Sequence, residues 1–323
     1  MNSRKALSGL LAVGALVVLA ACGGGSGSGS GPSKKDPVKI TVANLAVTNS
    51  AGLVLGKEKG FFADAGLDVQ IKDTPAASTV PAVVSGGAQF AFTGIPPLIN
   101  ARSNGLPIKA VAPAAGYPSD LAKSQIRLVA PKGSPLKELK DLEDKKVAVD
   151  TLFQLPHLSL IQALASEGID TSKIKFVEIP YPSMIDAMAS GKVDAADLGD
   201  PFLSQALADG GTALVSNGAG FEPGVTQVIW VASEKYIKQN PEVVKAFALA
   251  MEKSNSYAQA HPDEVRKIVP TYMKGTDKIA STMLLPEYTS TIDPGVFDVY
   301  GKIMSDRDLI KKTVTAADAV HQP

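Results

Sequence analysis

Short runs of β-branched and apolar residues alternate along this chain with longer segments whose apolar residues recur every three or four positions. Residues 38–46 and 67–71 have the composition of strands, and residues 53–65 between them have helical spacing. The same order continues to about residue 232. Further predicted strands span residues 89–92, 108–111, 126–130, 147–149, 175–179, 193–196 and 226–232. This alternation predicts an α/β fold with mostly parallel sheets covered on both faces.

The last third of the chain has a different pattern. Residues 241–260, 262–272 and 277–288 carry apolar residues at helical spacing, which predicts three amphipathic helices. The total length of 323 residues is typical of about two domains. We therefore expect two α/β units followed by a mostly helical C-terminal segment.

An internal repeat gives the two units a common design. Residues 85–98 and 190–203 align without gaps on the pattern S-G-x-x-(Q/D)-x-A-x-x-G-x-P-x-L. Each copy reads as a helix ending at glycine, a short buried strand, and a glycine turn leading into a helix opened by proline. Two such units predict two similar lobes. Because ligands of open α/β sheets bind at the carboxyl ends of the strands, two facing lobes would form a binding cleft.

Composition excludes several other classes of protein. The 32 basic residues balance the 32 acidic ones, so no basic excess points to nucleic acid as a partner. One cysteine and three histidines are too few for a disulfide framework or a Cys-rich zinc site. We expect no metal and no cofactor.

The N-terminus has the features of a targeting segment. Arg4 and Lys5 precede an apolar stretch at residues 6–21, and Leu19-Ala20-Ala21-Cys22 follows at its end. This resembles a bacterial lipobox, which implies that residues 1–21 are a lipoprotein signal peptide and that Cys22 is lipidated. A free cysteine in an uncleaved signal anchor is the alternative, although the apolar stretch is shorter than the roughly 20 residues that a membrane-spanning helix needs. Residues 22–37, rich in glycine and serine, would then be a flexible linker.

Motifs spread over most of the remaining chain carry a family resemblance. They are Gly60-Phe61-Phe62 with Gly66-Leu67-Asp68-Val69, Gln89-Phe90-Ala91-Phe92 with Gly94, residues 139–149, Gly191-Lys192-Val193-Asp194-Ala195, and Pro201-Phe202. In these motifs the chain resembles the solute-binding proteins of ABC importers, in the group that binds nitrate, taurine, aliphatic sulfonates and thiamine precursors. One position departs from the group, since Gly199-Asp200 stands where relatives often have Trp-Glu.

The resemblance implies a type II periplasmic binding protein, with two similar lobes joined by a two-crossing hinge. Lobe one would comprise residues 38–128 and 226–323, and lobe two residues 129–225, with crossings near residues 128–133 and 225–232. It also implies a monomer that captures a small-molecule solute and delivers it to an ABC permease and its ATPase. The lipid anchor would hold the protein on the extracytoplasmic face of the cell membrane.

The candidate ligand-binding residues lie on loops that follow the predicted strands. Their hydroxyls stand where helices begin, and helix N-termini can hold an anion by free N–H groups, although serine, threonine and aspartate are also common helix caps. The candidates are Leu45, Thr48, Asn49, Ser78, Thr79, Thr93, Gly94, Thr151, Leu152, Phe153, His157, Asp197, Asp200, Phe202 and Trp230.

The residue types on these loops leave two classes of solute open. The family resemblance favours a small anion such as a sulfonate, taurine or nitrate. The loops contain no lysine or arginine, however, while Asp197, Asp200 and several aromatic residues favour an amine-bearing or heteroaromatic solute such as a pyrimidine. An enzyme similar to thiamine-pyrimidine synthases is the alternative of another class. It is disfavoured because the folded body has no nucleophile elbow, no phosphate-binding glycine loop and no histidine-rich iron site.

Overall fold

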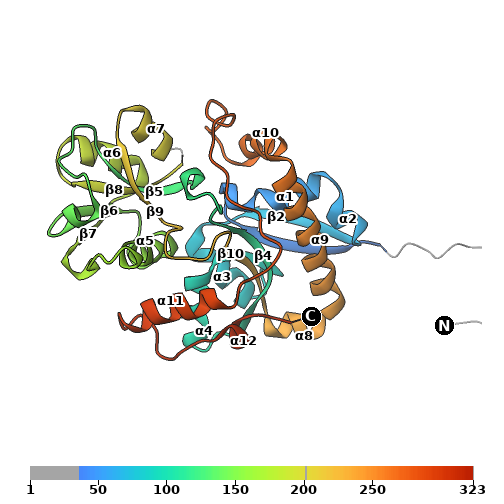
Figure 1. Ribbon diagram of the computed structural model, residues 1–323. Coiled ribbons are helices and arrows are strands. Elements are labelled where there is room, and N and C mark those ends of the chain that lie inside the picture. The colour runs from blue at the N-terminus through green and yellow to red at the C-terminus, as the bar shows by residue number, and fades with distance from the viewer. Residues whose placement is uncertain (1–35, 201, 323) are drawn as a thin grey trace, which may run out of the picture. The chain divides into compact units, whose positions relative to one another are not determined.

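Two five-stranded sheets are the framework of the protein (Figure 1). The computed structural model describes residues 36–200 and 202–322, so Cys22 and the predicted leader lie outside the described residues. The first sheet has the order β2-β1-β3-β10-β4 and the second the order β7-β6-β8-β5-β9. The strands of the first sheet are β1 (Val38–Asn44), β2 (Leu67–Asp73), β3 (Phe90–Gly94), β4 (Ile108–Gly116) and β10 (Thr226–Ser233). Those of the second are β5 (Ile126–Ala130), β6 (Lys146–Val149), β7 (Lys175–Glu178), β8 (Ala195–Gly199) and β9 (Thr212–Ser216).

Each sheet contains one strand that runs against the others. Strand β10 pairs antiparallel with both β3 and β4, and β5 pairs antiparallel with both β8 and β9. The remaining strands of each sheet therefore run in one direction, as the direct pairs of β1 with β2 and of β6 with β7 show. The α/β fold with mostly parallel sheets is confirmed.

The sequence repeat corresponds to a structural repeat. Strand β3 starts at Phe90 and ends at Gly94, and β8 starts at Ala195 and ends at Gly199. Both ends are thus displaced by the 105 residues that separate the two sequence copies. Both strands hold the central place of their sheets, between the parallel strands and the antiparallel one. The repeated motif therefore builds the same part of each lobe.

The chain passes from the first sheet to the second earlier than the sequence analysis placed it. Strand β5 is paired with β8 and β9 over its whole length, so residues 126–130 lie inside the second sheet. The first crossing accordingly runs through residues 117–125, and the expected position near residues 128–133 is wrong. The return crossing lies between β9 and β10, at residues 217–225, so it too comes before the expected position near residues 225–232. Leu128 pairs with Asp197 of β8, and the sequence around Leu128 does not reveal this long-range pairing.

Helices cover both sheets, and the C-terminal helices pack on the first one. Helix α9 contacts α1 and β4, and α11 contacts α4. The helices in contact with the first sheet or with one another are α1 (Ala51–Glu58), α2 (Phe61–Asp64), α3 (Ala76–Val84), α4 (Ile95–Ser103), α8 (Glu234–Gln239), α9 (Pro241–Ala260), α10 (Pro262–Tyr272), α11 (Gly295–Ser305) and α12 (Ala316–Ala319). The second lobe contributes α5 (Leu155–Ser166), α6 (Tyr181–Ala189) and α7 (Phe202–Ala208).

Two of the predicted helices differ from the structure. The segment at residues 53–65 is divided into α1 and α2 by Gly60, whose φ of 79° is in the left-handed region that favours glycine. Residues 277–288 form no regular helix. Their apolar residues make tertiary contacts instead. At the end of the segment, Glu287 forms an isolated bridge with Gly116, and Tyr288 belongs to the core. Local spacing alone does not distinguish these cases.

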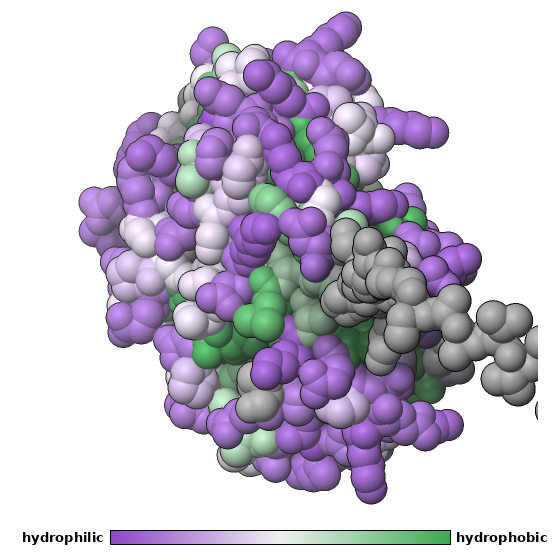
Figure 2. Space-filling view, turned by 90° about the vertical axis from the view of Figure 1, so that its right-hand side faces the viewer, coloured by the Kyte–Doolittle hydropathy of each residue, from purple (hydrophilic) through white to green (hydrophobic). Residues whose placement is uncertain are grey.

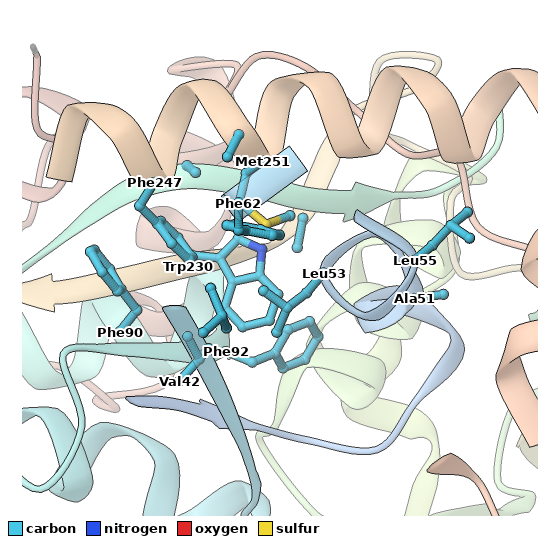
Figure 3. Close-up of a cluster of buried hydrophobic side chains, with 14 of the residues drawn as sticks. Val42, Ala51, Leu53, Leu55, Phe62, Phe90, Phe92, Trp230, Phe247 and Met251 are labelled. Atoms are coloured by element: carbon cyan, nitrogen blue, oxygen red, sulfur yellow. The ribbon is translucent and has the colours of Figure 1, made fainter. Parts of the chain in front are cut away.

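The core of the first lobe is built on the sheet face that α9 covers. Val244, Phe247 and Met251 are spaced by three and four positions along α9, and all three are buried. Trp230 on β10 lies beneath them, and its ring meets the ring of Phe247 edge-on with centroids 6.1 Å apart (Figure 3). The sole tryptophan is therefore part of the lobe-one core.

The surface on the right-hand side of Figure 1 is mostly hydrophilic, with a hydrophobic band near its centre (Figure 2). Large exposed apolar side chains occur singly, as at Leu249 on α9. Among the described residues, no helix is both long enough and apolar enough to cross a membrane.

Candidate ligand-binding site

The carboxyl ends of the parallel strands lead directly into helices. Helix α4 begins at the residue after β3, and in the second lobe α5 and α7 follow β6 and β8 after short loops. The first N–H groups of such helices have no partner within the helix and carry a partial positive charge. Each lobe therefore presents helix N-termini at one edge of its sheet.

These two edges face each other. A Cβ atom on Gly94, at the end of β3, would lie 3.2 Å from Cδ2 of Leu155, the first residue of α5. The Leu155 side chain also packs against both hydrophobic clusters of the first lobe. The start of α5 therefore rests on the strand end that carries Thr93 and Gly94, which makes this junction between the lobes the candidate ligand-binding site.

Asp197 is the most perturbed acidic group of this region. Its side chain is 1% exposed, and its Oδ2 accepts a hydrogen bond from Nδ2 of Asn217 at 3.0 Å. The other Nδ2 hydrogen of Asn217 is donated to the carbonyl of Pro156 on α5, also at 3.0 Å. The pKa of Asp197 is raised to about 7: burial is the largest cause, the bond from Asn217 opposes it, and the negative charge of Asp150 adds to the rise.

Two tyrosines lie within the electrostatic influence of Asp197. Burial raises the pKa of both Tyr117 and Tyr181, and the charge of Asp197 adds to the shift in each case. Ser159 on α5 is hydrogen-bonded to Tyr300 on α11 at 2.7 Å, and the Tyr300 hydroxyl also donates to Oε1 of Gln227. A polar network thus connects α5 of the second lobe with the first lobe.

Asp200 is saturated with donors from the protein. Its Oδ1 accepts hydrogen bonds from the N–H of Ser204 at 3.0 Å and from the Ser204 hydroxyl at 2.7 Å. Its Oδ2 accepts the main-chain N–H of Leu284 at 3.1 Å. Asp200 therefore caps α7 and binds a distant segment, so it has little capacity left to accept N–H groups of a solute.

The candidate residues of the first lobe differ in how far their polar groups are already used in hydrogen bonds within the protein. The carbonyl of Thr48 accepts the Tyr288 hydroxyl at 2.9 Å, and the buried Thr79 hydroxyl bonds the carbonyl of Ala76 within α3. Leu45 packs against the core, and the Asn49 amide oxygen accepts a long, 3.4 Å bond from the Thr48 hydroxyl. Ser78 is exposed in the first turn of α3, and Thr93 is buried on β3 opposite Ile229.

The loop between β6 and α5 has an internal support. Phe153 adopts a φ of 60°, which is strained for a bulky residue, and its side chain is 42% exposed. Its N–H donates to Nδ1 of His157 at 2.9 Å, so His157 holds this turn. Burial, together with the smaller effect of the Arg307 charge, lowers the pKa of His157 to about 4, so the ring is neutral at pH 7. Leu152 donates its N–H to Glu178 at 3.0 Å, while Thr151 is exposed beside Asp150.

The aromatic candidates have different surroundings. Phe202 is half-buried and lies parallel to Tyr181, with ring centroids 6.0 Å apart and 10° between the planes. Trp230 is fully buried between Phe92 and Phe247, so its ring packs in the core and not at the candidate site. On β10 its side chain points into the face covered by α9, a direction that the strand register decides.

Four residues of this region were missed by reasoning from the sequence. Tyr117 and Asn217 lie in the crossings, Tyr181 starts α6, and Gln227 is on β10, so these residues come near the site only through the fold. The available signal was a polar residue next to the end of a buried strand, as Asn217 is next to β9. That signal is too common to single out one residue.

The chain belongs to the NMT1/THI5-like family, whose model matches residues 47–265. Over 239 residues it is 27% identical to the taurine-binding periplasmic protein of Escherichia coli strain K12, which covers 69% of this chain and 72% of that protein.

Solved structures share the fold of this chain. The periplasmic aliphatic sulphonate binding protein SsuA from Escherichia coli superimposes with a TM-score of 0.74 at 19% identity, over 88% of this chain and 97% of that one. The desulfurization enzyme DSZB has a TM-score of 0.60 at 15% identity, over 88% of this chain and 96% of that one. The two-lobed fold therefore occurs in binding proteins and in an enzyme, and it does not by itself define the activity.

Proposed function

We propose that this chain is the solute-binding component of an ABC importer and that it captures a small anion of the sulfonate, taurine or nitrate class. The observation that carries the proposal is the approach of Gly94 to Leu155, because it brings the helix-bearing edges of both lobes together. The similarity to the taurine-binding and aliphatic sulphonate binding proteins supports the same role. Delivery to a permease and its ATPase follows from that role.

The anion would be held by groups that carry partial charge. The N-termini of α3 and α5 offer main-chain N–H groups, whereas Pro96 and Pro97 remove two of these donors from the first turn of α4. Ser78, Thr93 and Thr151 offer hydroxyls nearby. Closure of the lobes on the solute would bury these contacts, so a solute that touches both lobes favours the closed state.

We propose binding rather than catalysis. The buried carboxyl of Asp197 is hydrogen-bonded to an amide, Asn217, and His157 is tied to the main chain of Phe153, so neither residue activates a nucleophile through a hydrogen bond. The lipid anchor at Cys22 and the extracytoplasmic location are part of the same proposal. They are consistent with the role of the protein as a captor of external solute.

A second solute class has one observation in its favour. The parallel rings of Tyr181 and Phe202 stand close to the buried acid Asp197, and an aminopyrimidine or similar heteroaromatic molecule could use both features. The role in import would be unchanged.

The experiment that tests the proposal combines native mass spectrometry of the protein from its host with calorimetric titration. Taurine, ethanesulfonate, nitrate and 4-aminopyrimidine are the probes. Saturable binding of a sulfonate or nitrate supports the proposal, and binding of 4-aminopyrimidine alone selects the second class. Turnover of the tightest ligand would contradict a pure binding function.

A further inference from the structure

Two buried oxygen atoms at the candidate site lack a donor. Asp197 is 1% exposed and Asn217 is fully buried, and their side chains are hydrogen-bonded to each other at 3.0 Å. Within residues 36–200 and 202–322, Oδ1 of Asp197 and Oδ1 of Asn217 have no hydrogen-bond partner. Buried acceptors are nearly always paired in proteins, so an unpaired set at a candidate binding site points to a donor that is supplied from outside the chain.

The groups around Asp197 do not supply that donor. Asp150 follows β6 and is itself acidic, and the amide of Asn217 is already committed to Asp197 and to the Pro156 carbonyl. Tyr117, after β4, and Tyr181, on α6, are the other titratable groups whose environment includes Asp197. The influences on the pKa of Asp197 are burial, Asn217 and Asp150, and none of them is a basic side chain.

Asp197 and Asn217 lie close to the junction of the two lobes, where they could contact one end of a bound solute. Asp197 lies on β8, Asn217 follows β9, and the Pro156 carbonyl that Asn217 binds is in the first turn of α5. The next residue toward the N-terminus, Leu155, meets Gly94 of the first lobe. Helix N-termini at the same edges attract a negative group, so acceptors and anion-binding groups stand side by side.

We propose that Asp197 and Asn217 are specificity-determining residues that accept N–H groups from the solute, so that the protein prefers a solute with an ammonium or amino group. The inference rests on the proposed function and deepens it. Among sulfonates, it selects a zwitterionic aminosulfonate over the same molecule without the amine.

A proton is linked to this recognition. The Asp197 carboxyl is partly protonated near pH 7 in the free protein, and a bound ammonium group favours the ionised form. Binding of an ammonium-bearing solute at pH 7 therefore releases protons. The affinity for such a solute falls as the pH drops below 7, whereas the affinity for a solute without an amine does not follow this dependence.

The test compares two probes that differ in the amine alone, taurine and ethanesulfonate, by calorimetric titration of the full chain. We expect the wild type to prefer taurine and Asp197→Asn to weaken taurine binding by roughly ten- to a hundredfold, the range for a charge-assisted hydrogen bond. Ethanesulfonate binding should be unchanged or stronger. Asp186→Asn, which removes an exposed carboxylate on α6, is the matched control and should change neither affinity.

Proton release by the wild type gives a readout that does not depend on any variant. Titrations in two buffers of different ionisation enthalpy should show release with taurine and none with ethanesulfonate. Equal wild-type affinity for the two sulfonates, an unchanged preference in Asp197→Asn, or binding of taurine without proton release would overturn the inference, because water would then satisfy the two oxygens.

A third probe separates this inference from the proposed function. If neither sulfonate binds, but 4-aminopyrimidine binds and its affinity falls in Asp197→Asn, the proposed anion class is wrong and the proposed role of Asp197 and Asn217 is supported. If ethanesulfonate binds as tightly as taurine, the anion assignment stands and the inference fails. If none of these three probes binds and nitrate does not bind either, both the proposed function and this inference fail.

Discussion

The carboxylate of Asp200 and the main-chain N–H of Leu284 are hydrogen-bonded to each other at 3.1 Å, although 84 positions separate them in sequence. Asp200 follows β8 of the second sheet, and Leu284 belongs to the connection between α10 and α11, helices in contact with first-lobe elements. The side chain of Leu284 packs against the hydrophobic cluster of the second lobe. This contact therefore joins the two lobes away from the hinge crossings, and it stabilises their approach.

The first prediction concerns this contact. Asp200→Asn should keep an oxygen for Ser204 but present an NH₂ group to the N–H of Leu284. The hydrogen bond to Leu284 is then lost, and the contact between the lobes is weakened by about 1–3 kcal/mol. Small-angle scattering should show a more open solute-free protein. The affinity for every solute should fall by the same factor, since the change acts through closure. A loss confined to amine-bearing solutes would instead mean that Asp200 contacts the solute. Asp209→Asn, exposed just after α7, is the control.

The second prediction concerns Gly94. Its φ of −85° accommodates any residue, so Gly94→Ala introduces no backbone strain. The new methyl group would lie 3.2 Å from Leu155 Cδ2 and hold the two lobe edges slightly apart. We expect calorimetry to show weaker solute binding with little change in thermal unfolding of the solute-free protein. Gly87→Ala, where the nearest atom is 3.5 Å away, should bind as the wild type does. Equal affinities of the two variants would contradict a closely packed site.

The third prediction concerns Trp230. Because it is the sole tryptophan and is buried between Phe92 and Phe247, its fluorescence reports on the core alone. The emission maximum should stay in place when solute is added, and Trp230→Phe should retain the solute affinity. Trp230→Ala should lower the free energy of unfolding by about 3–5 kcal/mol in urea denaturation. A solute-dependent shift of the emission would show that the ring contacts the ligand after all.

The fourth prediction concerns pH. His157 has a pKa lowered to about 4, so the unfolded state binds more protons between pH 4 and 6.5, and this group lowers the unfolding free energy as the pH falls. Asp197 has a pKa raised to about 7, so the folded state binds more protons between pH 3.8 and 7, and its contribution falls as the pH rises. The two contributions oppose each other over most of this window.

Asp197→Asn removes one side of that balance. Relative to the wild type, the variant should gain unfolding free energy at pH 7.5, by up to about 1.4 kcal/mol per pKa unit of the Asp197 shift, and lose the advantage near pH 4. Urea denaturation at the two pH values measures the difference. A constant offset between variant and wild type across the range would mean that Asp197 is not perturbed. Asp186→Asn again controls for the loss of one carboxylate.

The fifth prediction concerns the membrane anchor. If Cys22 is lipidated, Cys22→Ala should release the full-length protein from the membrane fraction or block its processing, because the thiol is the site of acylation. Cell fractionation with immunoblotting checks this. Normal processing with unchanged membrane retention would rule out the lipid anchor. Cys22 lies outside the described residues, so this prediction depends on the sequence motif alone.

Much of the architecture was predictable from local pattern and repetition. Strand β5 and helices α9 and α10 have the bounds that the spacing predicts, and the repeat of 105 residues correctly identified β3 and β8 as equivalent strands of the two sheets. Strand β9 was missed, because residues 212–216 form a short run without a distinct period. The helix expected at residues 277–288 was wrong, because Glu287 and its neighbours satisfy their backbone in contacts with Gly116 instead. Local signals succeed where local and tertiary preferences agree.

By itself, the sequence determined the fold class and the family, since strand and helix periods and repeated glycine turns are properties of neighbouring residues. The location of the site stays a prediction. Only the tertiary structure decided which candidates face the site. Strand register turned Trp230 into the core, and the pairing of β5 with β8 and β9 placed Asn217 against Asp197. The physical reason is that burial and hydrogen-bond partners depend on residues far apart in the chain, and these decide whether an acid is free, saturated like Asp200, or buried and short of a donor like Asp197.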